Sequence, residues 1–123
     1  MASKSLLRAN IAENERIIKY RQREIDTIEE VLPLLRQDRK EIEKCKNYHK
    51  RTLDKKWFWK GPKYDNYSVY HYKATSLANN QLATVDYTIR AAEEYKKSAT
   101  EWIAECQAEI DQWEYQLAHW DDD

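Results

Sequence analysis

The chain has 123 residues, 35% of them charged, with a formal net charge of -1. Five Trp and nine Tyr beside one Gly and two Pro exclude a disordered composition, which is poor in aromatic residues. Few turn residues argue against a β-fold, so we predict an all-α single domain of long amphipathic helices.

The first predicted element is a helical arm over about residues 4–58. Polar residues interrupt its apolar pattern at Asn14, Arg21 and Arg39. They either set the register in which two helices pair or, for the two arginines, extend their charged groups beyond the apolar interface into solvent. Pro33 predicts a kink or brief break near Val31, and a full break into separate helices is the alternative. The apolar residues recur at steps of three and four and define one side of a seam: Leu7, Ile11, Ile18, Ile25, Ile28, Leu32, Leu35 and Ile42.

A turn is predicted at residues 59–62, near the middle of the chain. Its motif is Trp59, Gly61 and Pro62, and Gly61 is the only glycine. Proline suits the first position of a helix because its missing N–H and fixed φ cost nothing there. The two arms therefore form a long antiparallel hairpin, with Trp59 as a candidate hydrophobic clamp at the turn.

The second arm covers about residues 62–120, before an acidic tail at 121–123. Residues 1–60 carry sixteen Lys/Arg and ten Asp/Glu, a net of +6, whereas residues 61–123 carry five and twelve, a net of -7. Arms of opposite sign attract each other or other chains. Apart from Lys96, the seam of this arm is apolar throughout: Ala78, Leu82, Val85, Ile89, Ala92, Ala99, Ile103, Cys106, Ile110, Trp113, Leu117 and Trp120.

Beside the seam runs a second apolar stripe. With the turn at residues 59–62, the numbers of facing residues sum to about 122, so Tyr20 lies opposite Trp102. Residues one position before the seam then share one face of the hairpin. This stripe is either an exposed partner-binding surface or a wider two-helix core. Its members are Ile17, Tyr20, Val31, Leu34, Tyr87, Ala91, Tyr95 and Trp102.

No catalytic constellation, metal site or cofactor is predicted. The three histidines have no ligand-rich neighbourhood, and the register separates Cys45 from Cys106 too far for a disulfide. Both cysteines are therefore expected to be small core residues. Residues 36–63 contain eleven basic and four acidic residues near several aromatics, so binding of nucleic acid or a membrane surface at this tip is a lesser alternative.

Trp59-Lys60-Gly61, placed between two heptad-patterned helices in a short chain, resembles the W-x-G motif of the WXG superfamily of bacterial type VII secretion. Length and the lysine-rich first arm look closest to the YwqH-like helical partners of LXG-domain toxins. The resemblance implies that Trp59 packs between the arms and Gly61 permits the reversal. It departs from the family at the export signal, because Tyr115 is followed four residues later by His119 and Tyr95 by Ala99.

The resemblance implies a non-catalytic helical partner or chaperone that binds the N-terminal helical domain of an LXG-type toxin. It places the protein in the bacterial cytoplasm, or exported with its partner, without a cleaved signal peptide. A homodimeric coiled-coil scaffold is the competing hypothesis. No nucleic-acid partner and no membrane span is expected.

Overall fold

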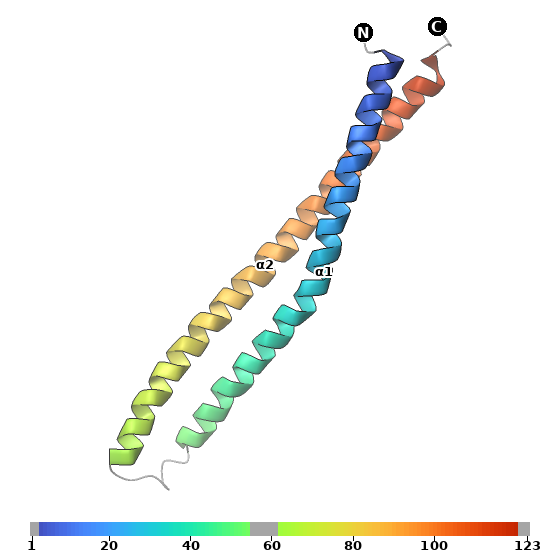
Figure 1. Ribbon diagram of the computed structural model, residues 1–123. Coiled ribbons are helices and arrows are strands. Elements are labelled where there is room, and N and C mark those ends of the chain that lie inside the picture. Colours follow the sequence, from blue (N-terminus) through green and yellow to red (C-terminus); the bar gives the residue numbers. More distant parts are fainter. Residues whose placement is uncertain (1–2, 55–61, 121–123) are drawn as a thin grey trace. The chain divides into compact units, whose positions relative to one another are not determined.

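A computed structural model describes the backbone of residues 3–54 and 62–120, with side chains outside residues 49, 51–54 and 62–67. Helix α1 spans Lys4–Asp54 and helix α2 spans Pro62–Ala118, and the two pack together (Figure 1). The described residues contain no strand. The predicted all-α two-helix hairpin is therefore confirmed.

Local chemistry explains most of the helix ends. The hydroxyl of Ser3 accepts a hydrogen bond from the backbone N–H of Leu6 at 3.0 Å, which satisfies a donor that the helix itself leaves open. Helix α2 begins at Pro62, as predicted. Trp59 and Gly61 of the predicted turn lie outside the described residues. Helix α1 is continuous across Pro33, so the alternative of a full break there is wrong.

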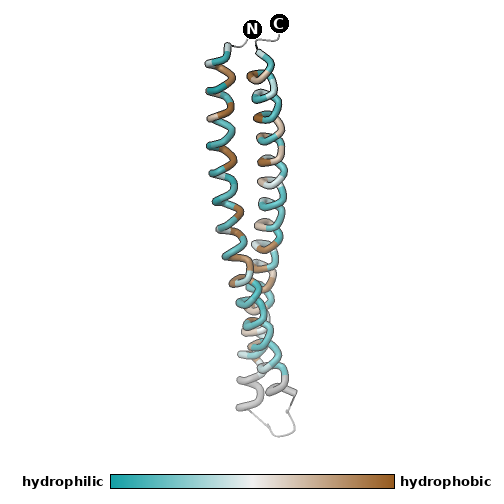
Figure 2. Tube along the Cα trace, turned by 90° about the vertical axis from the view of Figure 1, so that its right-hand side faces the viewer, coloured by the Kyte–Doolittle hydropathy of each residue, from teal (hydrophilic) through white to brown (hydrophobic). Residues whose placement is uncertain are grey.

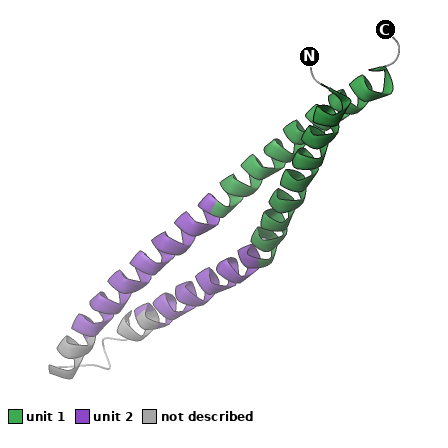
Figure 3. Ribbon diagram, turned by 45° about the horizontal axis from the view of Figure 1, so that its top comes forward, with its two compact units in different colours: residues 1–30, 92–123 green, residues 31–91 purple. Residues whose placement is uncertain are grey.

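The two helices divide into two compact units, each containing a piece of both helices (Figure 3). Unit 1 comprises residues 1–30 and 92–123, and unit 2 comprises residues 31–91. The units are described separately below.

Unit 1 has a well-covered apolar seam between its two helix segments. Asn14 is buried in this seam, and its side-chain amide donates hydrogen bonds to the Cys106 carbonyl at 3.3 Å and to Glu109 at 3.5 Å. The numbers of Asn14 and Cys106 sum to 120, close to the predicted register. Such a polar contact fixes register because a shifted pairing would leave the amide buried without partners. The buried apolar residues are Leu7, Ile25, Ala99, Cys106 and Ile110.

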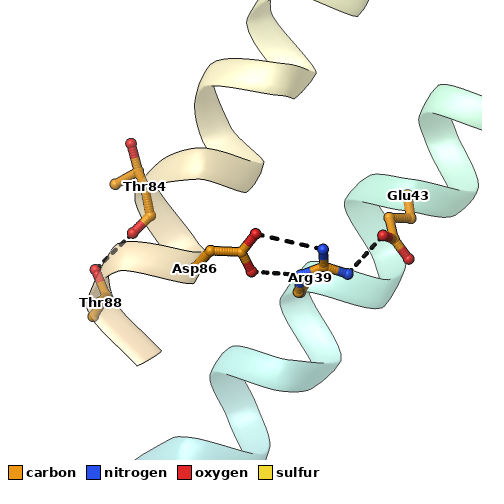
Figure 4. Close-up of polar contacts among 5 residues, drawn as sticks. All are labelled: Arg39, Glu43, Thr84, Asp86 and Thr88. Carbon is orange, nitrogen blue, oxygen red and sulfur yellow. Dashed lines mark hydrogen bonds and ion pairs between the residues drawn. The ribbon is translucent and has the colours of Figure 1, made fainter. Parts of the chain in front are cut away.

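The side chains between the two helix segments of unit 2 are less completely buried. Of the side chains described in it, only those of Leu32 and His71 are buried. The helices are joined where Arg39 Nε donates to Asp86 at 2.5 Å, while another nitrogen of Arg39 binds Glu43 at 2.6 Å (Figure 4). The numbers of Arg39 and Asp86 sum to 125, so the antiparallel register continues through this unit.

The predicted seam is largely confirmed. Each seam position is buried or half-buried except Trp120, which is exposed near the end of the described chain. Hydrophobic positions, drawn in brown, recur at intervals along both helices (Figure 2). Arg21, Arg39 and Lys96 occupy seam positions, and each reaches a carboxylate at the side of the seam. The Nε of Arg21 is buried and has no hydrogen-bond partner among the described residues.

Candidate interaction surfaces

The two sides of the seam differ in chemistry within each unit. Positions that directly follow a seam residue are mostly charged, including Lys19, Asp26, Lys40, Asp86 and Lys97. Positions that directly precede a seam residue contain no Lys or Arg and hold the large apolar side chains. A charged side favours water, whereas an exposed apolar side typically marks a docking surface. The large apolar residues on the preceding side are Leu6, Ile17, Tyr20, Val31, Leu34, Leu77, Tyr95 and Trp102.

In unit 1, four of the predicted stripe residues gather around Arg21. We call this set the aromatic patch; it consists of Ile17, Tyr20, Tyr95 and Trp102. The Arg21 guanidinium lies 4.0 Å from the centroid of the Trp102 ring and 5.4 Å from that of Tyr20. Cation–π attraction therefore tethers both rings to one cation. Trp102 and Tyr20 nevertheless remain 45% and 60% exposed, and the partner-binding role of the patch stays a prediction.

Hydrogen bonds hold this arrangement across the two helices. Arg21 Nη1 donates to Glu24 Oε1 at 2.6 Å and to the Tyr95 hydroxyl at 2.8 Å. The Tyr95 hydroxyl in turn donates to the second carboxylate oxygen of Glu24. This last bond lowers the pKa of Glu24 and raises the pKa of Tyr95, because it favours the charged carboxylate and the neutral phenol. These bonds connect Tyr95 of α2 to Arg21 and Glu24 of α1.

Tyr20 separates two shallow clefts in this patch. The first has a volume of about 460 Å³, and its lining residues are Arg16, Ile17, Tyr20, Arg21 and Trp102. The second has a volume of about 370 Å³, and its lining residues are Tyr20, Arg23, Glu24, Thr27, Ile28 and Tyr95. Tyr20 therefore stands as a ridge with contact space on either side.

The other four predicted stripe residues belong to unit 2. Val31, Leu34, Tyr87 and Ala91 are all exposed. Val31, Leu34 and Ala91 each directly precede a seam residue, whereas Tyr87 comes two positions before Ile89 and lies further round the helix. Their partner-binding role stays a prediction.

Unit 2 also contains a groove that the sequence did not predict. It has a volume of about 670 Å³, and we call it the unit 2 groove. Small residues at Ala74, Thr75 and Ala78 explain it, because α2 has too little side-chain volume there to fill the space beside α1. That cluster of small residues was the available signal. The lining residues are Asp38, Glu41, Ile42, Cys45, Lys46, Ala74, Thr75, Leu77, Ala78, Asn80, Gln81, Thr84 and Val85.

The cysteines behave differently from each other. Both are free thiols, but Cys45 is exposed in the unit 2 groove whereas Cys106 is buried in unit 1. The expectation that Cys45 is a core residue is wrong, because its side chain is exposed and lines the unit 2 groove. Burial raises the pKa of the Cys106 thiol, with a smaller contribution from Glu109.

Among the described side chains, no group of three or more His, Cys, Asp or Glu could hold a metal ion. No helix in the described part of the chain is long and apolar enough to cross a membrane. His71 is buried, with its Nε2 3.4 Å from the Thr75 hydroxyl.

Comparison of the chain with protein-family models, curated proteins and solved structures gave no match. The resemblance to type VII secretion partners therefore rests on the sequence pattern around Trp59 and Gly61.

Proposed function

We propose that this protein is a non-catalytic binding module that docks a helical partner on its aromatic patch. The observation that carries the proposal is the arrangement of Tyr20 and Trp102 around Arg21 on an exposed surface. Tyr, Trp and Arg are the residue types that dominate binding energy at protein interfaces.

The shape of the patch favours a helix as the bound element. Two clefts flank the Tyr20 ridge along a pair of packed helices. An incoming amphipathic helix places side chains at steps of three and four residues, and these can occupy the clefts while its own ridge contacts Trp102. The product is a small helical bundle, in which the apolar stripe becomes part of a core.

For the biological setting, we propose that the partner is the N-terminal helical domain of an LXG-type toxin of type VII secretion. Support comes from the W-x-G sequence at residues 59–61 between two long helices. In this setting the protein acts as a targeting factor or chaperone, either remaining in the bacterial cytoplasm or leaving with the toxin.

A direct test uses the N-terminal helical region of an LXG-type toxin. Isothermal titration calorimetry should show saturable binding to the wild-type protein. The double variant Tyr20→Ala/Trp102→Ala should bind at least tenfold more weakly, since truncation of hot-spot side chains typically costs about 2 kcal/mol or more.

A matched control is Tyr115→Ala, because Tyr115 is also an exposed tyrosine of unit 1 but lies off the patch, stacked on His119. Its affinity should equal that of the wild type. An equal loss of affinity in the control and in the double variant, or no binding by the wild type, would contradict the proposal.

A further inference from the structure

The two units carry opposite charge. Unit 1 contains eight Lys/Arg and sixteen Asp/Glu, a net of -8, and unit 2 contains thirteen and six, a net of +7. This contrast is larger than the one between the two arms of the sequence. Between two molecules, unit 1 of one and unit 2 of the other attract, whereas like units repel. Charge therefore favours one pairing of surfaces between copies.

Charged side chains also line both surfaces. The α1 side of the unit 2 groove contains Asp38, Glu41 and Lys46, and the first cleft of the aromatic patch contains Arg16 and Arg21. Arg16 pairs with Glu13 and Arg21 with Glu24 on the same helix. The attraction between the two surfaces therefore comes from the net charges of the units and not from these side chains.

The apolar surfaces also fit. The groove exposes Leu77, which is 59% accessible, beside the small side chains of Ala74 and Ala78. The patch offers the large exposed rings of Tyr20 and Trp102. A volume of about 670 Å³ lies within the usual range of sites that take up ring-sized groups. Since Leu32 and His71 are the only buried side chains among those described in unit 2, inserted rings would add to its buried apolar surface.

We propose that the unit 2 groove receives the aromatic patch of a second copy of this chain. Each molecule offers one patch and one groove, so the patch of one copy can bind the groove of another. This inference does not depend on the proposed helical partner. Where a partner occupies the same patch, however, self-association and partner binding exclude one another.

Sedimentation equilibrium of the full chain tests the inference. We expect a reversible dimer at low ionic strength that weakens as salt rises, because the Debye length falls to about 10 Å at 0.1 M and screens the attraction between units. A monomer at every concentration and salt level, or a dimer that tightens with salt, would overturn it.

Two surface variants locate the contact. Leu77→Asp places a charge in the groove and Trp102→Ala removes the largest ring of the patch. Each should raise the dissociation constant of the dimer at least tenfold. Tyr115→Ala should leave it unchanged. Circular dichroism of each variant checks that the helices persist. If both variants are helical and still dimerise like the wild type, the proposed surfaces are wrong.

Mixing the two disrupted variants gives a sharper test. The Leu77→Asp chain keeps an intact patch and the Trp102→Ala chain keeps an intact groove, so the patch of the first can bind the groove of the second. We expect a mixed dimer that is stronger than the dimer of either variant alone. Absence of any mixed dimer would contradict a contact between patch and groove.

A disulfide trap reports the same contact covalently. In Tyr20→Cys, oxidation should link the new thiol to Cys45 of the second copy, giving a dimer on non-reducing gels. Adding Cys45→Ser should abolish that band. A covalent dimer that survives the Cys45→Ser change would place the contact elsewhere and overturn the inference.

Discussion

The guanidinium of Arg21 lies 4.0 Å above the ring of Trp102, joining a seam position of α1 to an exposed aromatic of α2. The same cation binds Glu24 and the Tyr95 hydroxyl. Arg21 thus connects the packing of unit 1 to its candidate docking surface, and changes there should affect both.

Replacing Arg21 by Ala removes the cross-helix hydrogen bond and the cation–π contact together. We expect a lower melting temperature by circular dichroism, and Arg21→Lys should recover only part of the loss, because an ammonium lacks the planar fork and stacking surface of a guanidinium. The control is Arg16→Ala, which breaks an exposed pair with Glu13 on a single helix. Such pairs contribute little. Equal effects of Arg21→Ala and Arg16→Ala would contradict the role given to Arg21.

Thiol labelling should separate the two cysteines. In the native protein, maleimide should modify Cys45 rapidly and leave Cys106 unmodified, because Cys106 is buried and its raised pKa keeps it protonated. Mass spectrometry should show one adduct under native conditions and two in urea. Two adducts at similar rates in the folded protein would show that the seam around Cys106 is open.

Stability should fall in acid through specific carboxylates. The hydrogen bond from Arg39 lowers the pKa of Asp86 in the folded state, so this contribution is fully present above the ordinary carboxyl pKa. It is lost as the pH drops below about 4 and through the lowered value. Asp86→Asn should therefore be less stable than wild type at pH 7, with the difference shrinking in acid. A difference independent of pH would contradict the ion-pair assignment.

The two units should respond differently to loss of an apolar side chain. Ile110→Ala removes a buried side chain of unit 1 and should cost about 2–5 kcal/mol of unfolding free energy. Ile42→Ala truncates a half-buried residue beside the unit 2 groove and should cost less. Urea unfolding of both variants measures the difference. A larger loss for Ile42→Ala would mean that unit 2 holds the better-packed core.

Much of the fold was predictable because the seam repeats every three or four residues over both arms. That period determines which residues are buried, and the position of Gly61-Pro62 sets the pairing within a few residues. The start of α2 at Pro62 and the burial of Ile25, Ala99 and Ile110 follow directly.

The candidate surfaces were only partly predictable. Counting residues placed Tyr20 near Trp102, but the sequence could not show that Arg21 lies between the two helices as the shared contact of both rings. The unit 2 groove and the exposure of Cys45 were missed because a heptad pattern treats Ala78 and Leu82 alike as apolar. The volume that an alanine leaves unfilled appears only when the facing helix is present.

Thermal unfolding of Tyr20→Ala/Trp102→Ala tests whether Tyr20 and Trp102 form a docking surface or part of the core. It is followed by circular dichroism at a dilution where the chain is monomeric. We expect undiminished helix content and a melting temperature above that of Arg21→Ala, because the cation–π contacts are lost while Arg21 keeps its hydrogen bond to the Tyr95 hydroxyl. Loss of helix in the double variant would show that these side chains hold the hairpin together, and would contradict the proposed docking surface.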